Sequence, residues 1–151
     1  MNDHKQFRPI NILMAEDNPT DVMLTKEALA SSKIISELHI VDDGVEAIAF
    51  LYQQGKYIHV PRPDLILLDL NMPRKSGLEV LAELKQNMSL KSIPVIILTT
   101  SNSDEDIAEA YGHYTNCYIR KPMDFDSFIQ IIQSVQHFWF QIVTLPTKSI
   151  F

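Results

Sequence analysis

The sequence contains a single cysteine, Cys117, among its 151 residues. One cysteine excludes an internal disulfide framework and a zinc site of the CxxC kind. We therefore expect Cys117 to be a small apolar residue beside a strand, and the chain to reside in a reducing cytoplasm. No apolar stretch approaches the ~20 residues of a membrane-spanning helix. No polybasic run suggests a membrane surface, and the first residues lack the apolar centre of a signal peptide.

Basic residues are also scarce, with 13 Lys and Arg against 19 Asp and Glu and a net charge of −6. General affinity for nucleic acid requires a basic surface, so we expect none. No GxxxxGK phosphate loop occurs, and the five histidines show no metal-binding spacing. The hydrophobic content of 46% is normal for a soluble globular protein.

Five short apolar runs alternate with amphipathic stretches along the chain. A fully apolar run predicts a strand buried on both faces, and alternation with helices predicts right-handed crossovers in one parallel sheet. The sequence thus predicts one α/β domain with a doubly wound five-stranded sheet over residues 1–140, followed by a tail, 141–151. The predicted strands are residues 10–15, 38–41, 65–68, 94–98 and 117–119.

Polar residues with complementary chemistry follow four of these strands. Glu16 and Asp17 follow the first, Asp69 the third, Thr99 the fourth and Lys121 the fifth. Strand ends of a parallel sheet meet at its carboxyl edge, where open α/β folds place their sites. Converging carboxylates repel one another, and Mg²⁺ relieves this repulsion because it prefers oxygen ligands. We expect Asp17 and Asp69 to bind the metal directly and Glu16 to hold a metal-bound water, with Asp69 as nucleophile toward phosphorus.

The set Glu16-Asp17, Asp69, Thr99 and Lys121-Pro122 resembles the receiver domains of two-component response regulators. The resemblance implies a flavodoxin-like fold with strand order 2-1-3-4-5. It implies that Asp69 accepts a phosphoryl group from a sensor histidine kinase and that the chain catalyses only its own phosphorylation and slow dephosphorylation.

Individual roles also follow from this resemblance. The backbone carbonyl of Asn71 becomes a further metal ligand, and Thr99 and Lys121 bind the phosphoryl group. Thr99 and Tyr118 form a switch, and the peptide bond before Pro122 is cis. Glutamate at position 16 departs from the aspartate that many receivers carry there.

Two longer segments, residues 61–77 and 116–122, together with the aromatic end of the last helix, resemble the small response regulators of cyanobacterial phytochromes. This narrower resemblance implies a histidine kinase controlled by a bilin photoreceptor. No effector domain follows the receiver in the sequence, so we expect output through contacts with a downstream protein.

Two other classes of function are open to the sequence. A Mg²⁺-dependent phosphatase of the haloacid type could use Asp69 as nucleophile, but it usually needs a second aspartate where this chain has Asn71. A receiver that only binds a partner, without phosphorylation, is disfavoured by the full set of site residues. Uptake of one stable phosphate per chain distinguishes the three.

The triplet Phe138-Trp139-Phe140 has two interpretations. The triplet could end the last helix against the core, but three adjacent aromatic side chains cannot all point one way on a helix. We therefore expect at least one to be exposed, and we favour a homodimer through this end, with Tyr118 on the edge strand as a further contact.

Overall fold

The computed structural model describes residues 9–32, 35–101 and 103–142, and in these residues five strands form one parallel sheet. Their order is β2-β1-β3-β4-β5, which confirms the fold predicted from the sequence. The bounds are β1 (Ile10–Ala15), β2 (Ser36–Val41), β3 (Leu65–Leu68), β4 (Val95–Thr99) and β5 (Cys117–Arg120).

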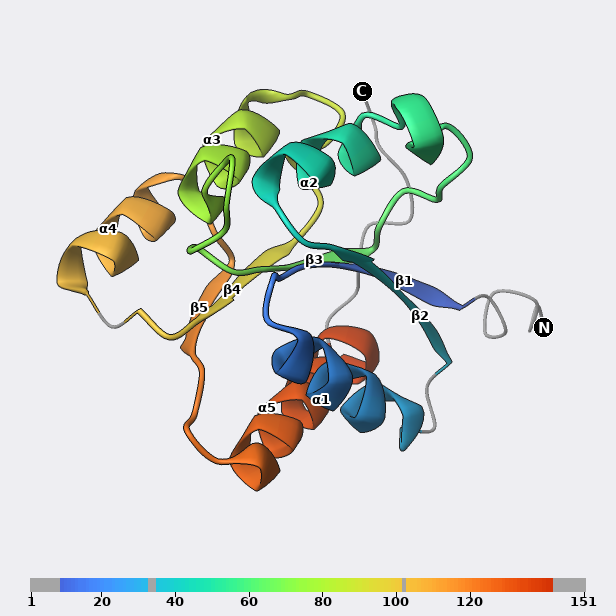
Figure 1. Cartoon of the computed structure of the whole chain (residues 1–151), viewed down its shortest axis with the longest axis vertical. Coiled ribbons are helices and arrows are strands. Elements are labelled where there is room, and N and C mark those ends of the chain that lie inside the picture. Colours follow the sequence, from blue (N-terminus) through green and yellow to red (C-terminus); the bar gives the residue numbers. More distant parts are fainter. Residues whose placement is uncertain (1–8, 33–34, 102, 143–151) are drawn as a thin grey trace.

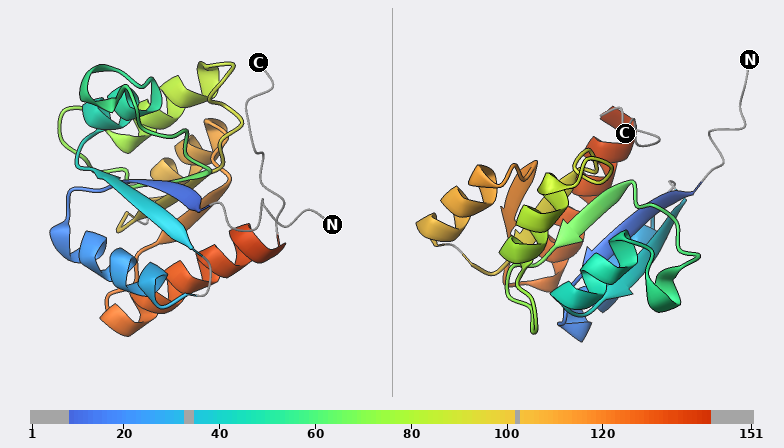
Figure 2. Two further views of the ribbon diagram at one scale, coloured as in Figure 1. Left: turned by 90° about the vertical axis from the view of Figure 1, so that its right-hand side faces the viewer. Right: turned by 90° about the horizontal axis from the view of Figure 1, so that it is seen from above.

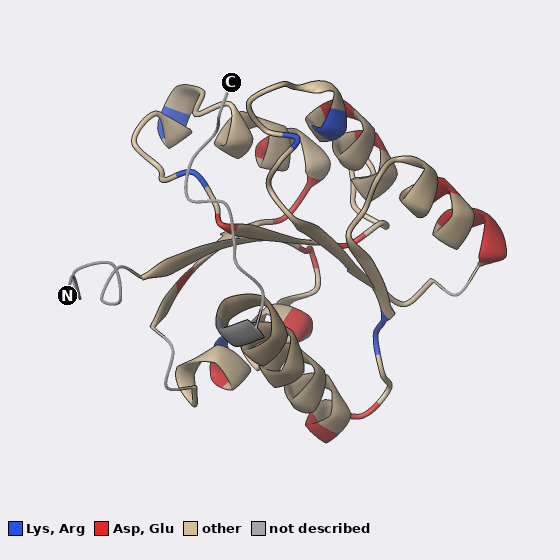
Figure 3. Cartoon of the chain, turned by 180° about the vertical axis from the view of Figure 1, so that it is seen from behind, with Lys and Arg blue, Asp and Glu red and all other residues tan. Residues whose placement is uncertain are grey.

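Helices cover both faces of the sheet (Figure 1). Helices α1 and α5 lie side by side on one face, and α2, α3 and α4 lie on the other, as the two views in Figure 2 confirm. The helices are α1 (Pro19–Ala30), α2 (Gly44–Leu51), α3 (Gly77–Gln86), α4 (Asp104–Gly112) and α5 (Phe125–His137). Acidic residues mark the starts of α4 and α5 in Figure 3.

The central strands are almost entirely apolar because the sheet is covered on both faces. Every residue of β3 and β4 is buried. Alternate side chains of β3 enter different cores: Ile66 and Leu68 pack under α2 and α3, whereas Leu65 and Leu67 pack under α1 and α5. A strand between two helical layers has no solvent-facing side, so alternation of polar and apolar residues disappears.

Local capping fixes where the helices begin. The Asn18 side chain accepts hydrogen bonds from the backbone N–H groups of Thr20 and Asp21, with Pro19 at the first helical position. Asp43 caps α2 through the N–H of Glu46 at 2.8 Å. These caps lie directly after β1 and β2, so they also fix the loops that carry the acidic residues.

The predicted boundaries need small corrections. Strand β2 begins at Ser36, two residues earlier than predicted, and a short 3₁₀ turn, η2 (Gly55–Tyr57), interrupts the loop before β3. Helix α5 continues into a π-helical turn, η3 (Phe138–Ile142). Residues 143–151 of the predicted tail lie outside the described residues. No helix in the described part of the chain has the length and apolar character needed to cross a membrane.

Candidate metal and phosphorylation site

The predicted site residues meet at the carboxyl edge of the sheet. Backbone hydrogen bonds extend the ladder one residue past the strands: the Asp69 N–H donates to Ala15 O at 3.0 Å, and the Lys121 N–H donates to Thr99 O at 2.7 Å. These bonds hold side chains from four strand ends in fixed register. Glu16, Asp69, Thr99 and Lys121 are all buried, and Asp17 is exposed.

The Lys121 ammonium lies among three carboxylates. Its Nζ atom is 2.5 Å from Glu16 Oε1, 2.8 Å from Asp21 Oδ2 and 3.5 Å from Asp69 Oδ2. An ammonium group has three N–H donors, so three acceptors use its full capacity. Each of the three N–H donors of Lys121 therefore has a carboxylate partner.

Carboxylates outnumber cations at this site, where one ammonium group lies among three carboxylates. Burial raises the pKa of Glu16 to about 7, with the charge of Asp69 adding to the rise and the hydrogen bond from Lys121 opposing it. Burial acts to lower the pKa of Lys121, but its hydrogen bonds to Asp21 and Glu16 outweigh burial and the pKa is raised. A further cation would relieve the excess of carboxylates.

Three carboxylates can supply ligands for such a cation. One oxygen each from Glu16, Asp17 and Asp69 lies within 4.8 Å of the others, a spacing that fits a hard divalent ion. Both oxygens of Glu16 are already engaged, Oε1 by Lys121 and Oε2 by the N–H of Asn18 at 3.2 Å. Asn71 adjoins the cluster, and its N–H is 3.4 Å from Asp69 Oδ1.

Gly77 keeps the loop after β3 close to Asp69. A Cβ atom at position 77 would lie 2.1 Å from the backbone oxygen of Asp69, a distance that no side chain could accept. The Gly77 N–H donates to Leu70 O at 2.9 Å and fastens the start of α3 to the same segment. Gly77 is thus a packing residue: the site needs glycine here because the backbone of Asp69 occupies the space of a side chain.

The two predicted switch residues are connected through one residue, Ser101. Thr99 is fully buried, and its Oγ1 lies 3.4 Å from the N–H of Ser101. Tyr118 is half-buried, and its hydroxyl donates to the carbonyl of Ser101 at 3.0 Å. Burial also raises the pKa of Tyr118, so the hydroxyl stays protonated and available as a donor.

The prediction of a cis peptide bond before Pro122 is wrong. No peptide bond in the described residues is cis, so Lys121 and Pro122 are joined in the trans form. Trans is the lower-energy form even before proline. The lysine reaches the acidic residues without an isomerised bond because β5 pairs with β4 and delivers its side chain to the sheet edge.

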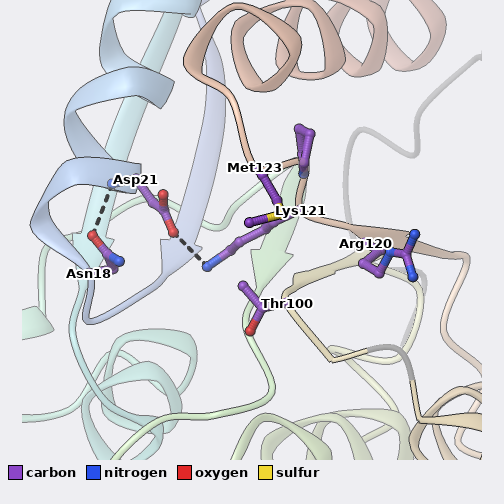
Figure 4. Close-up of a pocket in the computed structure, with 7 residues that line it drawn as sticks. Asn18, Asp21, Thr100, Arg120, Lys121 and Met123 are labelled. Atoms are coloured by element: carbon purple, nitrogen blue, oxygen red, sulfur yellow. Dashed lines mark hydrogen bonds and ion pairs between the residues drawn. The ribbon is translucent and has the colours of Figure 1, made fainter.

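Sequence reasoning missed Asp21. It lies in the first turn of α1, and its carboxylate contacts Lys121 at the wall of a pocket of about 810 Å³ that both residues line (Figure 4). Thr100 and Met123 also line this pocket. Its spacing of four from Asp17 is not a signal, because Asp17 lies before the helix, which begins at Pro19.

The aromatic triplet separates into two groups. Phe138 is 48% exposed, whereas Trp139 and Phe140 pack against the core between the sheet and helices α1 and α5. This confirms that at least one ring is exposed, and it leaves Phe138 as the main candidate contact of the triplet. Tyr118 is half-buried against the opposite core.

The fold and this site define a class. A five-stranded parallel sheet of order 2-1-3-4-5 with an acidic cluster, a buried threonine and a lysine at its carboxyl edge is the architecture of a response-regulator receiver. The response regulator receiver domain model matches residues 12–133. The chain belongs to this family, which acts by phosphorelay signalling and whose members bind a divalent metal.

Two relatives, Rcp1 and RcpA, are similar to this chain over nearly its whole length. The chain is 49% identical over 138 residues to response regulator Rcp1 of Synechocystis sp., covering 91% of this chain and 94% of Rcp1. The structure of the phosphorylated cyanobacterial phytochrome response regulator RcpA matches with a TM-score of 0.90 at 46% identity, covering 93% of this chain and 100% of that one. The Mn²⁺-bound form of Rcp1 matches with a TM-score of 0.89 at 48% identity, covering 92% and 100%.

Proposed function

We propose that Asp69 is the phosphoacceptor of this response regulator, and that a sensor histidine kinase is its phosphodonor. The observation that carries the proposal is the position of the Asp69 carboxylate, which is buried beside the metal-ligand oxygens and 3.5 Å from the Lys121 ammonium. The groups around this carboxylate can balance the charge that a phosphoryl group brings.

The transfer conserves atoms and electrons. An Asp69 oxygen attacks phosphorus of the phosphohistidine, a P–O bond forms, and the P–N bond breaks with its electron pair returning to the imidazole, which takes up a proton. Mg²⁺, held by Asp17 and Asp69 with Glu16 acting through water and the Asn71 carbonyl as a further ligand, would neutralise charge on the transferring oxygens. Lys121 donates to a phosphoryl oxygen, and the Thr99 hydroxyl donates to another.

The chain's catalysis is limited to its own phosphorylation and slow dephosphorylation. Rapid hydrolysis by a phosphatase mechanism requires a general acid two residues after the nucleophile, and the amide of Asn71 cannot fill that role. A long-lived acyl phosphate suits a signal, because its lifetime sets how long the altered state persists.

Phosphorylation alters the surface of the protein through a change in side-chain packing near the site. A phosphoryl group on Asp69 draws the Thr99 hydroxyl away from the Ser101 N–H, and the loop between β4 and α4 then shifts the hydrogen bond that Tyr118 makes. After phosphorylation the shifted packing is favoured, because it binds the phosphoryl group better than the resting packing does. The altered surface contacts a downstream protein and not nucleic acid or a membrane, which the net charge of −6 supports.

The proposed donor is a histidine kinase of the phytochrome type in the cytoplasm. The similarity to Rcp1 and RcpA over more than nine-tenths of the chain supports this partner. We also propose a homodimer through Phe138, supported by its exposure at the end of α5, with residues 1–140 as the receiver and 141–151 as a tail.

Phosphotransfer tests this function directly. The full chain is mixed with Mg²⁺ and a radiolabelled, autophosphorylated phytochrome kinase, with an unrelated histidine kinase as control. We expect transfer of one acid-resistant, base-labile phosphate per chain, much faster from the phytochrome kinase. Equal rates from both kinases would contradict the partner, and multiple turnover to free phosphate would favour a phosphatase.

A further inference from the structure

Asp21 provides the site with a carboxylate that belongs to neither the metal cluster nor the phosphoacceptor. Its Oδ2 atom is 2.8 Å from Lys121 Nζ (Figure 4). Asp69 Oδ2 is farther from the same nitrogen, at 3.5 Å. The Asp21 side chain is only 17% exposed. The contact joins α1 to the residue after β5, 100 positions away in the chain.

The geometry of α1 aims this carboxylate at the lysine. The Asn18 side chain caps the helix by accepting from the N–H groups of Thr20 and Asp21. A carboxylate in the first helical turn is favourable for the helix dipole at any outward angle. The dipole alone therefore does not explain why the Asp21 side chain points inward to an ammonium group.

Competition for the ammonium follows from its donor count. Lys121 has three N–H donors, and Glu16, Asp21 and Asp69 lie around them. A phosphoryl oxygen that arrives on Asp69 must replace one of these acceptors. Glu16 makes the shortest contact, and Asp69 becomes the phosphoryl carrier itself, so Asp21 is the acceptor to be displaced.

We propose that Asp21 is a positioning residue that holds Lys121 in a resting position and competes with the phosphoryl group for its ammonium. This inference rests on the proposed role of Asp69. By this competition, Asp21 weakens the phosphorylated state relative to the unphosphorylated one and thereby helps to set how readily the site is discharged.

The test measures the affinity of the full chain for beryllofluoride, a phosphoryl analogue, in saturating Mg²⁺. Asp21→Asn should bind the analogue about tenfold more tightly, because one competing charge-assisted hydrogen bond is lost. Asp21→Glu, which keeps the carboxylate, should remain within about threefold of the wild type.

Asp42→Asn is the matched control for loss of one negative charge. Asp42 is exposed and lines a groove with Glu16 and Asp17, and Lys121 is not part of that groove. Its substitution should change the affinity by less than about threefold, since exposed charges are screened. Affinity that is unchanged or weaker in Asp21→Asn, or raised equally in both variants, would overturn the proposal.

A second measurement does not depend on phosphorylation. In the metal-free protein, the NMR signal of the Lys121 ammonium should shift and exchange faster with water in Asp21→Asn, and stay unchanged in Asp42→Asn. An unchanged signal in Asp21→Asn would overturn the resting contact. Wild-type protein that fails to bind beryllofluoride would instead contradict the role of Asp69, while this signal still reports on Asp21.

Discussion

The hydroxyl of Tyr118 donates a hydrogen bond of 3.0 Å to the backbone carbonyl of Ser101. The N–H of the same serine lies 3.4 Å from the Thr99 hydroxyl. Ser101 thus joins the buried threonine at the end of β4 to the half-buried tyrosine of β5. A movement of the Thr99 hydroxyl changes the support of the loop that also accepts from Tyr118.

Removing the threonine hydroxyl should separate phosphorylation from output. Thr99→Ala keeps Asp69, Lys121 and the metal ligands, so phosphate uptake should stay within about threefold of the wild type. The phosphorylated variant should lose most of the change that phosphorylation causes in the NMR signals of Tyr118. A full wild-type change in those signals would contradict the link through Ser101.

Loss of the exposed metal ligand should weaken metal binding. Asp17→Asn removes one carboxylate from the three-residue cluster. We expect Mg²⁺ affinity measured by calorimetry to fall at least about tenfold, since a charged ligand is replaced by a neutral one. Asp42→Asn again serves as the control, and equal affinity in Asp17→Asn and wild type would transfer the direct role to Glu16.

A lysine far from the site gives the stability a pH dependence. Lys85 on α3 donates to the carbonyls of Lys91 and Ile93 at 3.0 and 3.1 Å, and burial lowers its pKa from 10.5 to about 8. Between pH 8 and 10.5 the unfolded chain therefore binds more protons at this residue, so its contribution to stability increases with pH.

Lys85→Met should reveal this contribution. The urea midpoint of the wild type should rise relative to that of the variant between pH 7 and pH 9.5, because the cost of burying a charged Lys85 disappears as it deprotonates. Lys91→Met is the control, because it tests whether removal of any lysine changes the pH dependence of the urea midpoint in the same way. A difference between wild type and Lys85→Met that stays constant or falls with pH would show that Lys85 keeps its ordinary pKa.

The exposed ring at the end of α5 should carry the association of two copies. Burying a large aromatic side chain contributes roughly 1.5–3 kcal/mol before the costs of association, and a twofold dimer buries it on both partners. Sedimentation should find a dimer at tens of micromolar and mostly monomer for Phe138→Ala. Phe125→Ala, at the opposite end of α5 and 62% exposed, should remain dimeric. A wild-type monomer would contradict the dimer.

The sequence predicts the central strands well because a strand buried on both faces appears in the sequence as a short apolar run. Every residue of β3 and β4 is buried, and their apolar runs locate both strands to within a residue. The edge strand β2 is less buried and mixes polar with apolar residues, so its start at Ser36 is two residues earlier than predicted.

Site residues that follow strands can be predicted from the sequence, whereas a site residue on a helix, such as Asp21, cannot. Glu16, Asp69, Thr99 and Lys121 follow from strand ends, which parallel pairing brings together. Asp21 enters the site through the direction of α1, and this direction depends on packing of α1 against α5 and not on local sequence. The side-chain contact through Ser101 is likewise a property of tertiary packing.

Mass spectrometry of the phosphorylated residue tests the central claim most directly. The full chain and Asp69→Asn are incubated with acetyl phosphate and Mg²⁺, and borohydride reduction then labels any aspartyl phosphate in place. We expect one label, at position 69, in the wild type, and none in Asp69→Asn, whose amide is nearly isosteric but a poor nucleophile. A label at another residue in the wild type, or equal phosphate uptake by Asp69→Asn, would contradict Asp69 as the phosphoacceptor.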